Sequence, residues 1–211
     1  GFEKMFRLGD PPNYEPAEED SILAIARREG REPQEVAYDI LLERDGHELI
    51  FLPFTNYTER NHEIILEMMK DDQSLFGLGD GGAHCGLICD ATIPTYLLTH
   101  WVRDRNRGER LPLEWIVKRQ TRDNAEFFGL HDRGTLAPGM KADVNVIDFD
   151  RLTLKPPHIV HDLPAGGRRL VQKAEGYLAT IQSGEITFEQ GIHSGALPGT
   201  LVRGRQKPPA A

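Results

Sequence analysis

Cysteine is nearly absent from this chain of 211 residues, which contains only Cys85 and Cys89. Two cysteines exclude a disulfide framework, and the C-x3-C spacing lacks the further Cys or His ligands that complete a structural zinc site. We therefore expect two reduced thiols that pack in the interior or line a site.

Long apolar runs are also missing. The longest are of the size of "LIFL" at 49–52, far below the roughly 20 residues that span a bilayer. The first residues show no signal-peptide pattern, and position 1 is Gly rather than Met. These features predict a cytoplasmic protein without a membrane partner, and we expect the chain to be part of a longer protein.

Positive charge is in short supply, because 25 Lys and Arg face 33 Asp and Glu, for a net charge of −8 without a basic tail. Binding to nucleic acid relies on clustered Lys and Arg, so the sequence predicts no nucleic-acid partner. The hydrophobic fraction of 39% and the charged fraction of 27% are typical of a soluble globular protein.

Helical patterns dominate the first half. Acidic residues followed by apolar spacing predict a helix from Pro16 to Gly30, and Pro33 begins a second helix that stops at Gly46, so the two form a hairpin. "HELIFLPF" at 47–54 predicts a buried strand. The next helix is "NHEIILEMMKDD", and we expect the side chains of Ile64, Ile65, Met68 and Met69 to face inward. A further strand at Ser74–Leu78 would complete a βαβ unit, and helices follow near Pro94 and up to Gly129.

The character of the sequence changes near Leu130. From there on, short β-prone runs alternate with Gly and Pro turns. We predict that the segments Met140–Phe149 and Gly176–Ile181 are strands of one β-structure, distinct from the helices before Gly129.

The stretch "SLFGLGDGGAHCG" at 74–86 crowds glycines around Asp80. It satisfies G-x-G-x-x-G, but a carboxylate inside that loop would repel a pyrophosphate and the residues that follow break a helix, so a dinucleotide site is disfavoured. Asp80 could be a turn aspartate that binds its own backbone, and His84 a structural histidine. The alternative is a strand that delivers Asp80 to its carboxyl end, where the glycines let a ligand approach.

Other metal and nucleophile motifs fail. "HEII" at His62 lacks the second histidine of H-E-x-x-H, and no G-x-S-x-G elbow occurs. His158 and His161 are three positions apart but are flanked by prolines, which disfavours a metal site. Taken alone, Tyr14 is expected to be a surface or packing tyrosine.

Two stretches, "FTNYTERNHEIILEMMKDD…LFGLGDGGAHCGLICDATIPTYLLTHWVRDR" and "GLHDRGTLAPGMKADVNVIDFD", resemble the C-terminal portion of the N-acyl-D-amino-acid deacylases (D-aminoacylases), a branch of the amidohydrolase superfamily. The likeness covers nearly the whole chain. The order of "GDGGAH" and then "DRGTLAPGMKAD" is more specific than either motif alone.

The resemblance implies a role for Asp80 as the general acid/base on the metal side of a Zn²⁺-dependent hydrolase, which cleaves the amide of a small N-acyl amino acid. A zinc ion lowers the pKa of its water, and a neighbouring carboxylate can then move the proton. The resemblance also places His84 and Tyr14 in the wall or lid of the substrate site.

The implied fold is α/β: the C-terminal part of a (β/α)₈ barrel over 1–129, with a helical lid insertion at about 14–46, and then a small β-sandwich segment over 130–211. The family's His-x-His is missing from this sequence. The remaining zinc ligands are therefore expected outside this chain, supplied by the remainder of the barrel or by another copy of the chain.

Two alternatives stay open. A cyclic-amide hydrolase, similar to hydantoinases or dihydroorotases, would keep the superfamily and change the substrate. A non-catalytic association module would use the glycine loop only as a turn.

Overall fold

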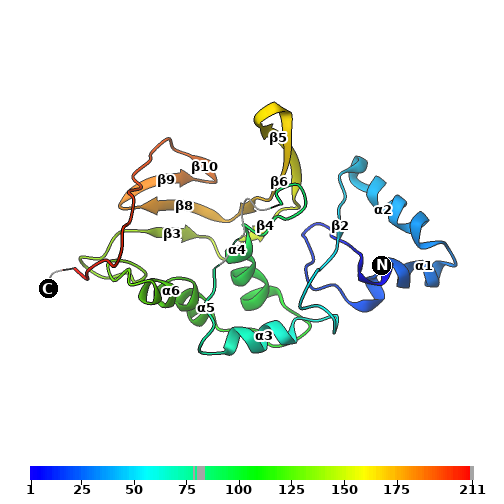
Figure 1. Cartoon of the computed structure of the whole chain (residues 1–211), viewed down its shortest axis with the longest axis horizontal. Helices are drawn as coiled ribbons and strands as arrows, with labels where there is room; N and C mark the ends of the chain where they lie inside the picture. The colour runs from blue at the N-terminus through cyan, green and yellow to red at the C-terminus, as the bar shows by residue number, and fades with distance from the viewer. Residues whose placement is uncertain (78, 80–83, 210–211) are drawn as a thin grey trace.

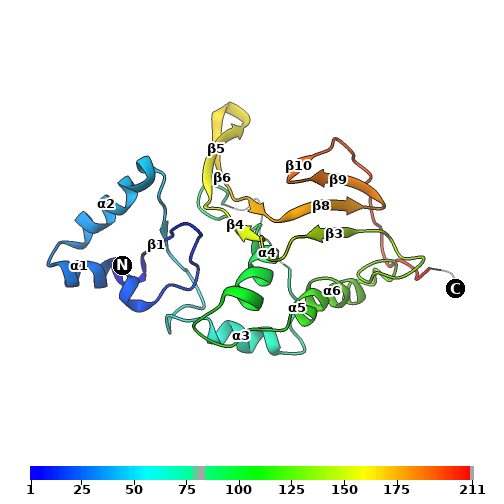
Figure 2. The same ribbon diagram turned by 180° about the vertical axis from the view of Figure 1, so that it is seen from behind.

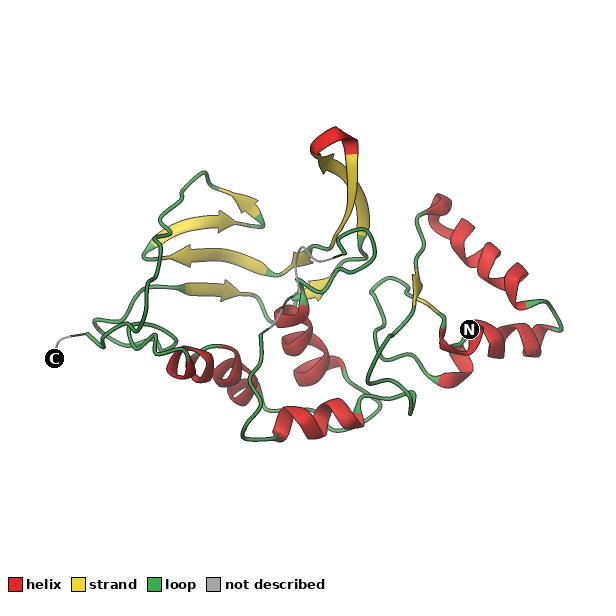
Figure 3. Cartoon of the chain, in the orientation of Figure 1, coloured by secondary structure: helices red, strands yellow, loops and turns green. Residues whose placement is uncertain are grey.

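The computed structural model describes residues 1–77, 79 and 84–209 (Figure 1). Helices occupy the first part of the chain and strands most of the second (Figure 3). The helices are α1 (Ile22–Glu29), α2 (Pro33–Gly46), α3 (Glu63–Lys70), α4 (Ile93–Leu98), the π-helix η3 (Thr99–Asp104), α5 (Leu113–Gln120) and α6 (Arg122–Phe127), with short 3-10 turns at Phe2–Lys4, Glu18–Asp20 and Pro164–Gly166. The strands are β1 (Phe6–Arg7), β2 (Ile50–Phe51), β3 (Val144–Ile147), β4 (Thr153–Leu154), β5 (His158–Leu163), β6 (Gly167–Val171), β7 (Ala174–Glu175), β8 (Tyr177–Gln182), β9 (Glu185–Glu189) and β10 (Ile192–His193).

The helices α1 and α2 form the expected hairpin. The hydroxyl of Ser21 accepts a hydrogen bond from the amide of Ala24 and so caps α1, while Gly30 ends the helix in the left-handed conformation, with φ of 65°. The acidic residues before Ser21 form a separate 3-10 turn rather than the first turn of the helix. Apolar side chains close the hairpin around a small core of Ile22, Ala26, Val36 and Ile40.

Two details of α2 differ from the sequence prediction. Leu41 was expected on the inner face with Val36 and Ile40, but it is 44% exposed. The helix also loses regular geometry before Gly46, because Arg44 and Asp45 have positive φ angles. The last turn therefore folds back, and β2 follows directly and pairs with β1.

The larger core lies between the central helices and the start of the β-rich segment. Its buried members are Leu66, Met69, Leu97, Leu98, Trp101, Leu111, Ile116 and Leu152. In α3 the predicted inward face is confirmed for Met69, which is buried, and for Ile65, which packs against the core, but it is wrong for Ile64 and Met68. These two are 44% and 42% exposed, and Leu66 is buried instead. Burial at 66 and 69 follows the i, i+3 spacing of one helix face.

The predicted strand at Ser74–Leu78 is wrong for its described part, because residues 74–77 form no strand. Side chains from the following helices satisfy the backbone there. Arg119 donates to the carbonyl oxygens of Asp71 and Ser74, and the Asn124 amide donates to that of Phe76 at 2.6 Å. Since these carbonyls are bound by α5 and α6, they are not available to a neighbouring strand.

The β-rich segment forms a four-stranded antiparallel sheet in the order β10-β9-β8-β3, beside the hairpin β5-β6 and the short pair β4-β7. Strand β3 pairs with β8 through Val144 and Ile181. This pairing confirms that Met140–Phe149 and Gly176–Ile181 contribute strands to one β-structure. The views in Figures 1 and 2 place this sheet on one side of the central helices and the α1–α2 hairpin on the other.

The expected βαβ unit is absent from the described residues, because β2 pairs antiparallel with β1 and no strand is described between α3 and α4. All strand pairs described here are antiparallel, and their sheets do not close into a barrel. Nothing in these pairings tests the division at residue 130 or the lid at about 14–46, which stay predictions. None of the helices in the described part of the chain is long and apolar enough to span a membrane.

Candidate functional site

The site residues predicted from the sequence differ in whether the structure describes them and in how exposed they are. Asp80 falls outside the described residues. His84 is exposed and has a positive φ of 45°. The segment that His84 begins packs on β6, since the amide of Leu170 donates to the carbonyl of Cys85 at 2.7 Å. Cys85 and Cys89 are both free thiols.

Tyr14 is half-buried and is joined to the segment that follows the glycine loop. Its hydroxyl donates to the side-chain oxygen of Gln172 at 3.2 Å, and the Thr92 hydroxyl donates to the same oxygen at 2.5 Å. The Gln172 amide nitrogen donates to the carbonyl of Lys155, which fixes the amide. Burial raises the pKa of Tyr14 to about 12, so its phenol is a neutral hydrogen-bonding group near Cys89.

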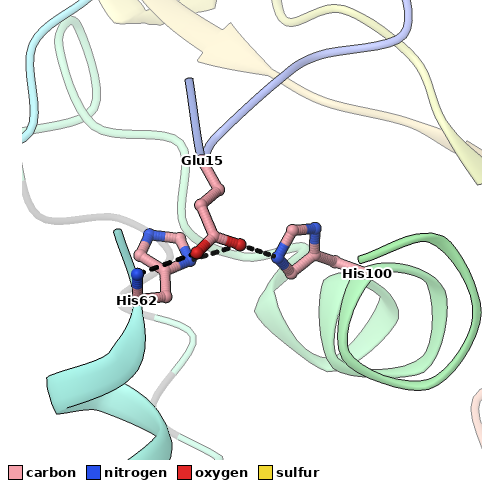
Figure 4. Close-up of side chains that lie close together, drawn as sticks. All are labelled: Glu15, His62 and His100. Carbon is pink, nitrogen blue, oxygen red and sulfur yellow. Dashed lines mark hydrogen bonds and ion pairs between the residues drawn. The ribbon is translucent and has the colours of Figure 1, made fainter. Parts of the chain in front are cut away.

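A second polar group lies near Tyr14, whose ring contacts Tyr96, which in turn stacks on His100. Glu15 from the N-terminal loop, His62 at the start of α3 and His100 in η3 point toward one another (Figure 4). One ligand atom from each lies within 4.8 Å of the other two. With Arg105, which follows η3, these residues are called the Glu15 cluster below.

Glu15 is the centre of the cluster, and its side chain is 1% exposed. Arg105 donates to both carboxylate oxygens, each at 3.0 Å, and Nε2 of His100 lies 2.7 Å from Oε2. The backbone amide of His62 donates to Oε1 at 2.8 Å. Burial alone would raise the pKa of Glu15, but the hydrogen bonds from His100, Arg105 and the His62 amide outweigh it and hold that pKa well below its usual range. Glu15 is therefore ionised at neutral pH.

His62 is the neutral member. Burial lowers the pKa of its imidazole to about 4, against the opposing attraction of Glu15. Its ring stacks on Trp101 at a centroid distance of 5.9 Å. Its Nδ1 is buried without a hydrogen-bond partner, 3.8 Å from Oε2 of Glu15.

The spacing of one carboxylate and two imidazoles could hold a metal ion, and the unpartnered Nδ1 of His62 is a free donor atom. The other contacts do not fit a cation. Both oxygens of Glu15 are already bound by a guanidinium, which carries the opposite charge that the carboxylate needs. The cluster as it stands is therefore a poor metal site.

A cavity of about 370 Å³ adjoins the cluster. Glu15, Tyr96 and His100 form one part of its wall, and Asp20, Asp104 and Arg107 lie among the polar groups around it. The cavity is thus built where the N-terminal loop meets η3.

The Glu15 cluster was not predicted from sequence. His62 was considered only as part of a failed H-E-x-x-H motif, and Glu15, His100 and Arg105 were not considered. His62, His100 and Arg105 lie 47, 85 and 90 positions after Glu15 in the sequence, so no local spacing brings them to Glu15. The one available signal is the pair of His100 and Arg105 on a single predicted helix.

Comparison with known proteins agrees with the expected superfamily. Residues 15–188 match the sequence model of the Amidohydrolase family. Two curated relatives, 5-methylthioadenosine/S-adenosylhomocysteine deaminases from Desulfitobacterium hafniense strains DSM 10664 / DCB-2 and Y51, are each 42% identical over 67 residues. That match covers 29% of this chain and 15% of each relative, so the chain spans only a small part of their length. No solved structure matches the chain.

The two relatives are deaminases rather than D-aminoacylases, so the comparisons support the superfamily and leave the finer activity open. The family typically binds a metal and has a (β/α)₈ barrel. The described chain mixes helices with sheets that do not close, as expected for a portion of such an enzyme. Because the family match extends over most of the sequence, the chain belongs to the amidohydrolase family, whose members are hydrolases that act on carbon–nitrogen bonds.

Proposed function

We propose that the complete enzyme hydrolyses the amide of N-acyl-D-amino acids and that Asp80 is its general acid/base. The observation that carries the proposal is family membership over residues 15–188, together with "GDGGAH" at 79–84 followed by "DRGTLAPGMKAD". The helical hairpin of α1 and α2 falls within residues 14–46, where we propose a lid, and such a lid favours a linear substrate.

In the proposed reaction the Asp80 carboxylate accepts a proton from water while the water oxygen bonds to the carbonyl carbon. The carbon–nitrogen bond then breaks, and the same carboxyl group gives its proton to the leaving nitrogen. The products are a free carboxylate and a free amino acid. Tyr14 and His84 are proposed to contact the substrate, and Tyr14 has support from its position beside Thr92 and Cys89, which follow the glycine loop.

We propose Zn²⁺ as the metal of the complete enzyme. Asp80 is the metal-side residue of this chain, and the other ligands come from the remainder of the barrel or from another copy of the chain. The proposed ligand is a small N-acyl amino acid, and we propose no nucleic-acid or membrane partner. We also propose that the chain divides into two parts near residue 130.

The test is the release of free amino acid from N-acetyl-D-amino acids by the complete enzyme. The variant Asp80→Asn keeps the shape of the side chain but cannot accept the proton, so turnover should fall by about 10²-fold or more. Asp72→Asn is the matched control, because Asp72 is exposed outside the glycine loop. Full activity of Asp80→Asn would contradict the proposal, whereas turnover only of hydantoins or dihydroorotate would replace the linear substrate with a cyclic one.

The isolated 211-residue chain gives a second test. We expect it to hold no stoichiometric zinc and to hydrolyse no N-acyl-D-amino acid, because a catalytic zinc usually takes three protein ligands and Asp80 is a single carboxylate. Metal content after dialysis and amino-acid release are the two measurements. Bound zinc with turnover that disappears in Asp80→Asn would mean that this chain builds its own site.

A deaminase is the second candidate, favoured by the 42% identity over 67 residues to 5-methylthioadenosine/S-adenosylhomocysteine deaminases. Deamination also adds water to a carbon bonded to nitrogen, so Asp80 could serve in the same way. Release of ammonia from 5-methylthioadenosine or S-adenosylhomocysteine would separate this activity from amide hydrolysis.

A further inference from the structure

We propose that the Glu15 cluster is a metal-free clamp in which Arg105 supplies the positive charge and fastens the N-terminal loop to η3. The metal of the family is then not bound by these residues, although ligand atoms of Glu15, His62 and His100 lie within 4.8 Å of one another. The inference depends only on the described contacts and stands independently of the proposed substrate.

The hydrogen bonds of the Glu15 carboxylate are complete without a metal. A carboxylate offers about four acceptor sites. Oε1 accepts from the His62 amide and from Nη2 of Arg105, and Oε2 accepts from Nε of Arg105 and from His100. A cation would have to displace at least one of these donors.

The distance between His100 and Glu15 is also that of a hydrogen bond. Two ligands about 2.0–2.1 Å from a tetrahedral zinc lie about 3.4 Å apart. Nε2 of His100 and Oε2 of Glu15 are only 2.7 Å apart, so a proton fits between them and a zinc ion does not. The imidazole Nδ1 of His62 lies farther away, at 3.8 Å from the same oxygen.

Arg105 is fixed in place and cannot easily make room for a cation. Its side chain is 0% exposed, and its guanidinium lies 4.5 Å from the centre of the Trp101 ring. The remaining donors bind the carbonyl of Glu109 at 2.9 Å and the carboxylate of Glu63 at 2.7 Å. A divalent cation on Glu15 would share that carboxylate with a buried positive charge, and the repulsion between them would be strong.

The clamp holds more than one side chain. Arg107, two positions further on, donates to the carbonyl oxygens of Glu15 and Pro16 at 2.9 and 3.0 Å, and the Tyr57 hydroxyl also donates to the carbonyl of Pro16. The loop is therefore fixed through its side chain and its backbone. This arrangement sets one wall of the 370 Å³ cavity and fixes the backbone next to Tyr14.

The first experiment measures unfolding of the unmodified chain in urea with and without EDTA, and then with added Zn²⁺. A metal-free clamp predicts the same midpoint in all three conditions. A midpoint that falls with EDTA, or zinc retained after gel filtration by the unmodified chain but lost from a His62→Gln/His100→Gln variant, would overturn the proposal. The dependence on these two histidines separates this site from any metal held near Asp80, and neither outcome depends on hydrolytic activity.

The second experiment tests the ion pair itself with Glu15→Gln, Arg105→Met and the double variant. Glu15→Gln leaves the buried Arg105 with only the more exposed Glu63 as an ionic partner, and Arg105→Met leaves the buried Glu15 carboxylate without its guanidinium. The ratio of folded to unfolded chain should therefore fall by roughly 100-fold or more in each single variant. The double variant should lose no more than the worse single one. Additive losses would contradict the clamp. Glu126→Gln is the control, since its pair with Arg122 is more than half exposed and should change little.

Discussion

The side-chain oxygen of Gln172 accepts a hydrogen bond from the Tyr14 hydroxyl, 158 positions earlier in the chain. The same oxygen accepts from Thr92, so one amide joins the N-terminal loop, the segment after the glycine loop and the turn after β6. Gln172 thus holds Tyr14, while Arg105 holds the neighbouring Glu15.

We predict that Gln172→Leu destabilises the chain more than Tyr14→Phe does. Tyr14→Phe removes one hydrogen bond and should lower the free energy of unfolding by about 1 kcal/mol, whereas Gln172→Leu leaves three part-buried partners unsatisfied. Urea denaturation measures both. Tyr38→Phe is the control, because Tyr38 is 63% exposed. Equal losses of unfolding free energy in all three variants would show that the hydrogen bonds of Gln172 do not stabilise the chain.

The buried imidazole of His62 predicts an acid-dependent loss of stability. Its pKa is about 4 in the folded chain and 6.5 ordinarily, so between these values the unfolded chain binds a proton that the folded chain does not. The free energy of unfolding should be unaffected by this group above pH 6.5 and should fall by about 3 kcal/mol as the pH approaches 4. Below about 4.5 Glu15 adds to this loss, because the unfolded chain binds a proton at this carboxyl group while its depressed pKa keeps it ionised in the folded chain.

The measurement is urea denaturation at a series of pH values for the unmodified chain and for His62→Gln. The groups that face His62 are Glu15, His100, Arg105 and Arg107, and they stay unchanged in this variant. The slope between pH 6.5 and 4.5 should flatten in His62→Gln and persist in His193→Gln, whose histidine is exposed in β10. An unchanged slope in His62→Gln would show that another group titrates there.

Two adjacent residues of α5 give a prediction about the larger core. Ile116 is 0% exposed and Val117 is 43% exposed. Ile116→Ala should cost about 2–5 kcal/mol of unfolding free energy, because it removes buried methylene groups and leaves a cavity. Val117→Ala should stay within about 0.5 kcal/mol. Similar losses for the two variants in thermal or urea unfolding would show that α5 does not face the core in this register.

The sequence correctly predicted the helix ends and strands that are determined by residues close together in the chain. The end of α1 at Gly30 and the start of α2 at Pro33 follow from the backbone preferences of these two residues. Strands β3 and β8 follow from alternating apolar residues between turns. Each of these features depends on neighbours in the chain.

The failures depend on distant residues. The segment 74–77 is apolar enough for a strand, but Arg119 and Asn124 bind its carbonyls from helices more than 40 positions later. The Glu15 cluster likewise depends on an ion pair across 90 positions. Asp80 was identified by its family resemblance, and its position lies outside the described residues, so its role stays a proposal.

The last prediction concerns the turn that joins β7 to β8. Gly176 has a φ of 103°, and a Cβ atom added there would lie 2.6 Å from the Cα of Leu152 and 2.8 Å from its nitrogen. These are backbone atoms of a residue that is 0% exposed, so they cannot move aside without disturbing the core. Gly176→Ala should therefore lower the unfolding free energy by roughly 3 kcal/mol or more, from backbone strain and overpacking together. Gly184→Ala is the matched control, since Gly184 also has a positive φ, of 86°, but has open space around it; strain alone should cost about 1–2 kcal/mol. Both variants are compared by urea denaturation. Equal losses would mean that Leu152 is free to move away and that the contact between this turn and the core is loose.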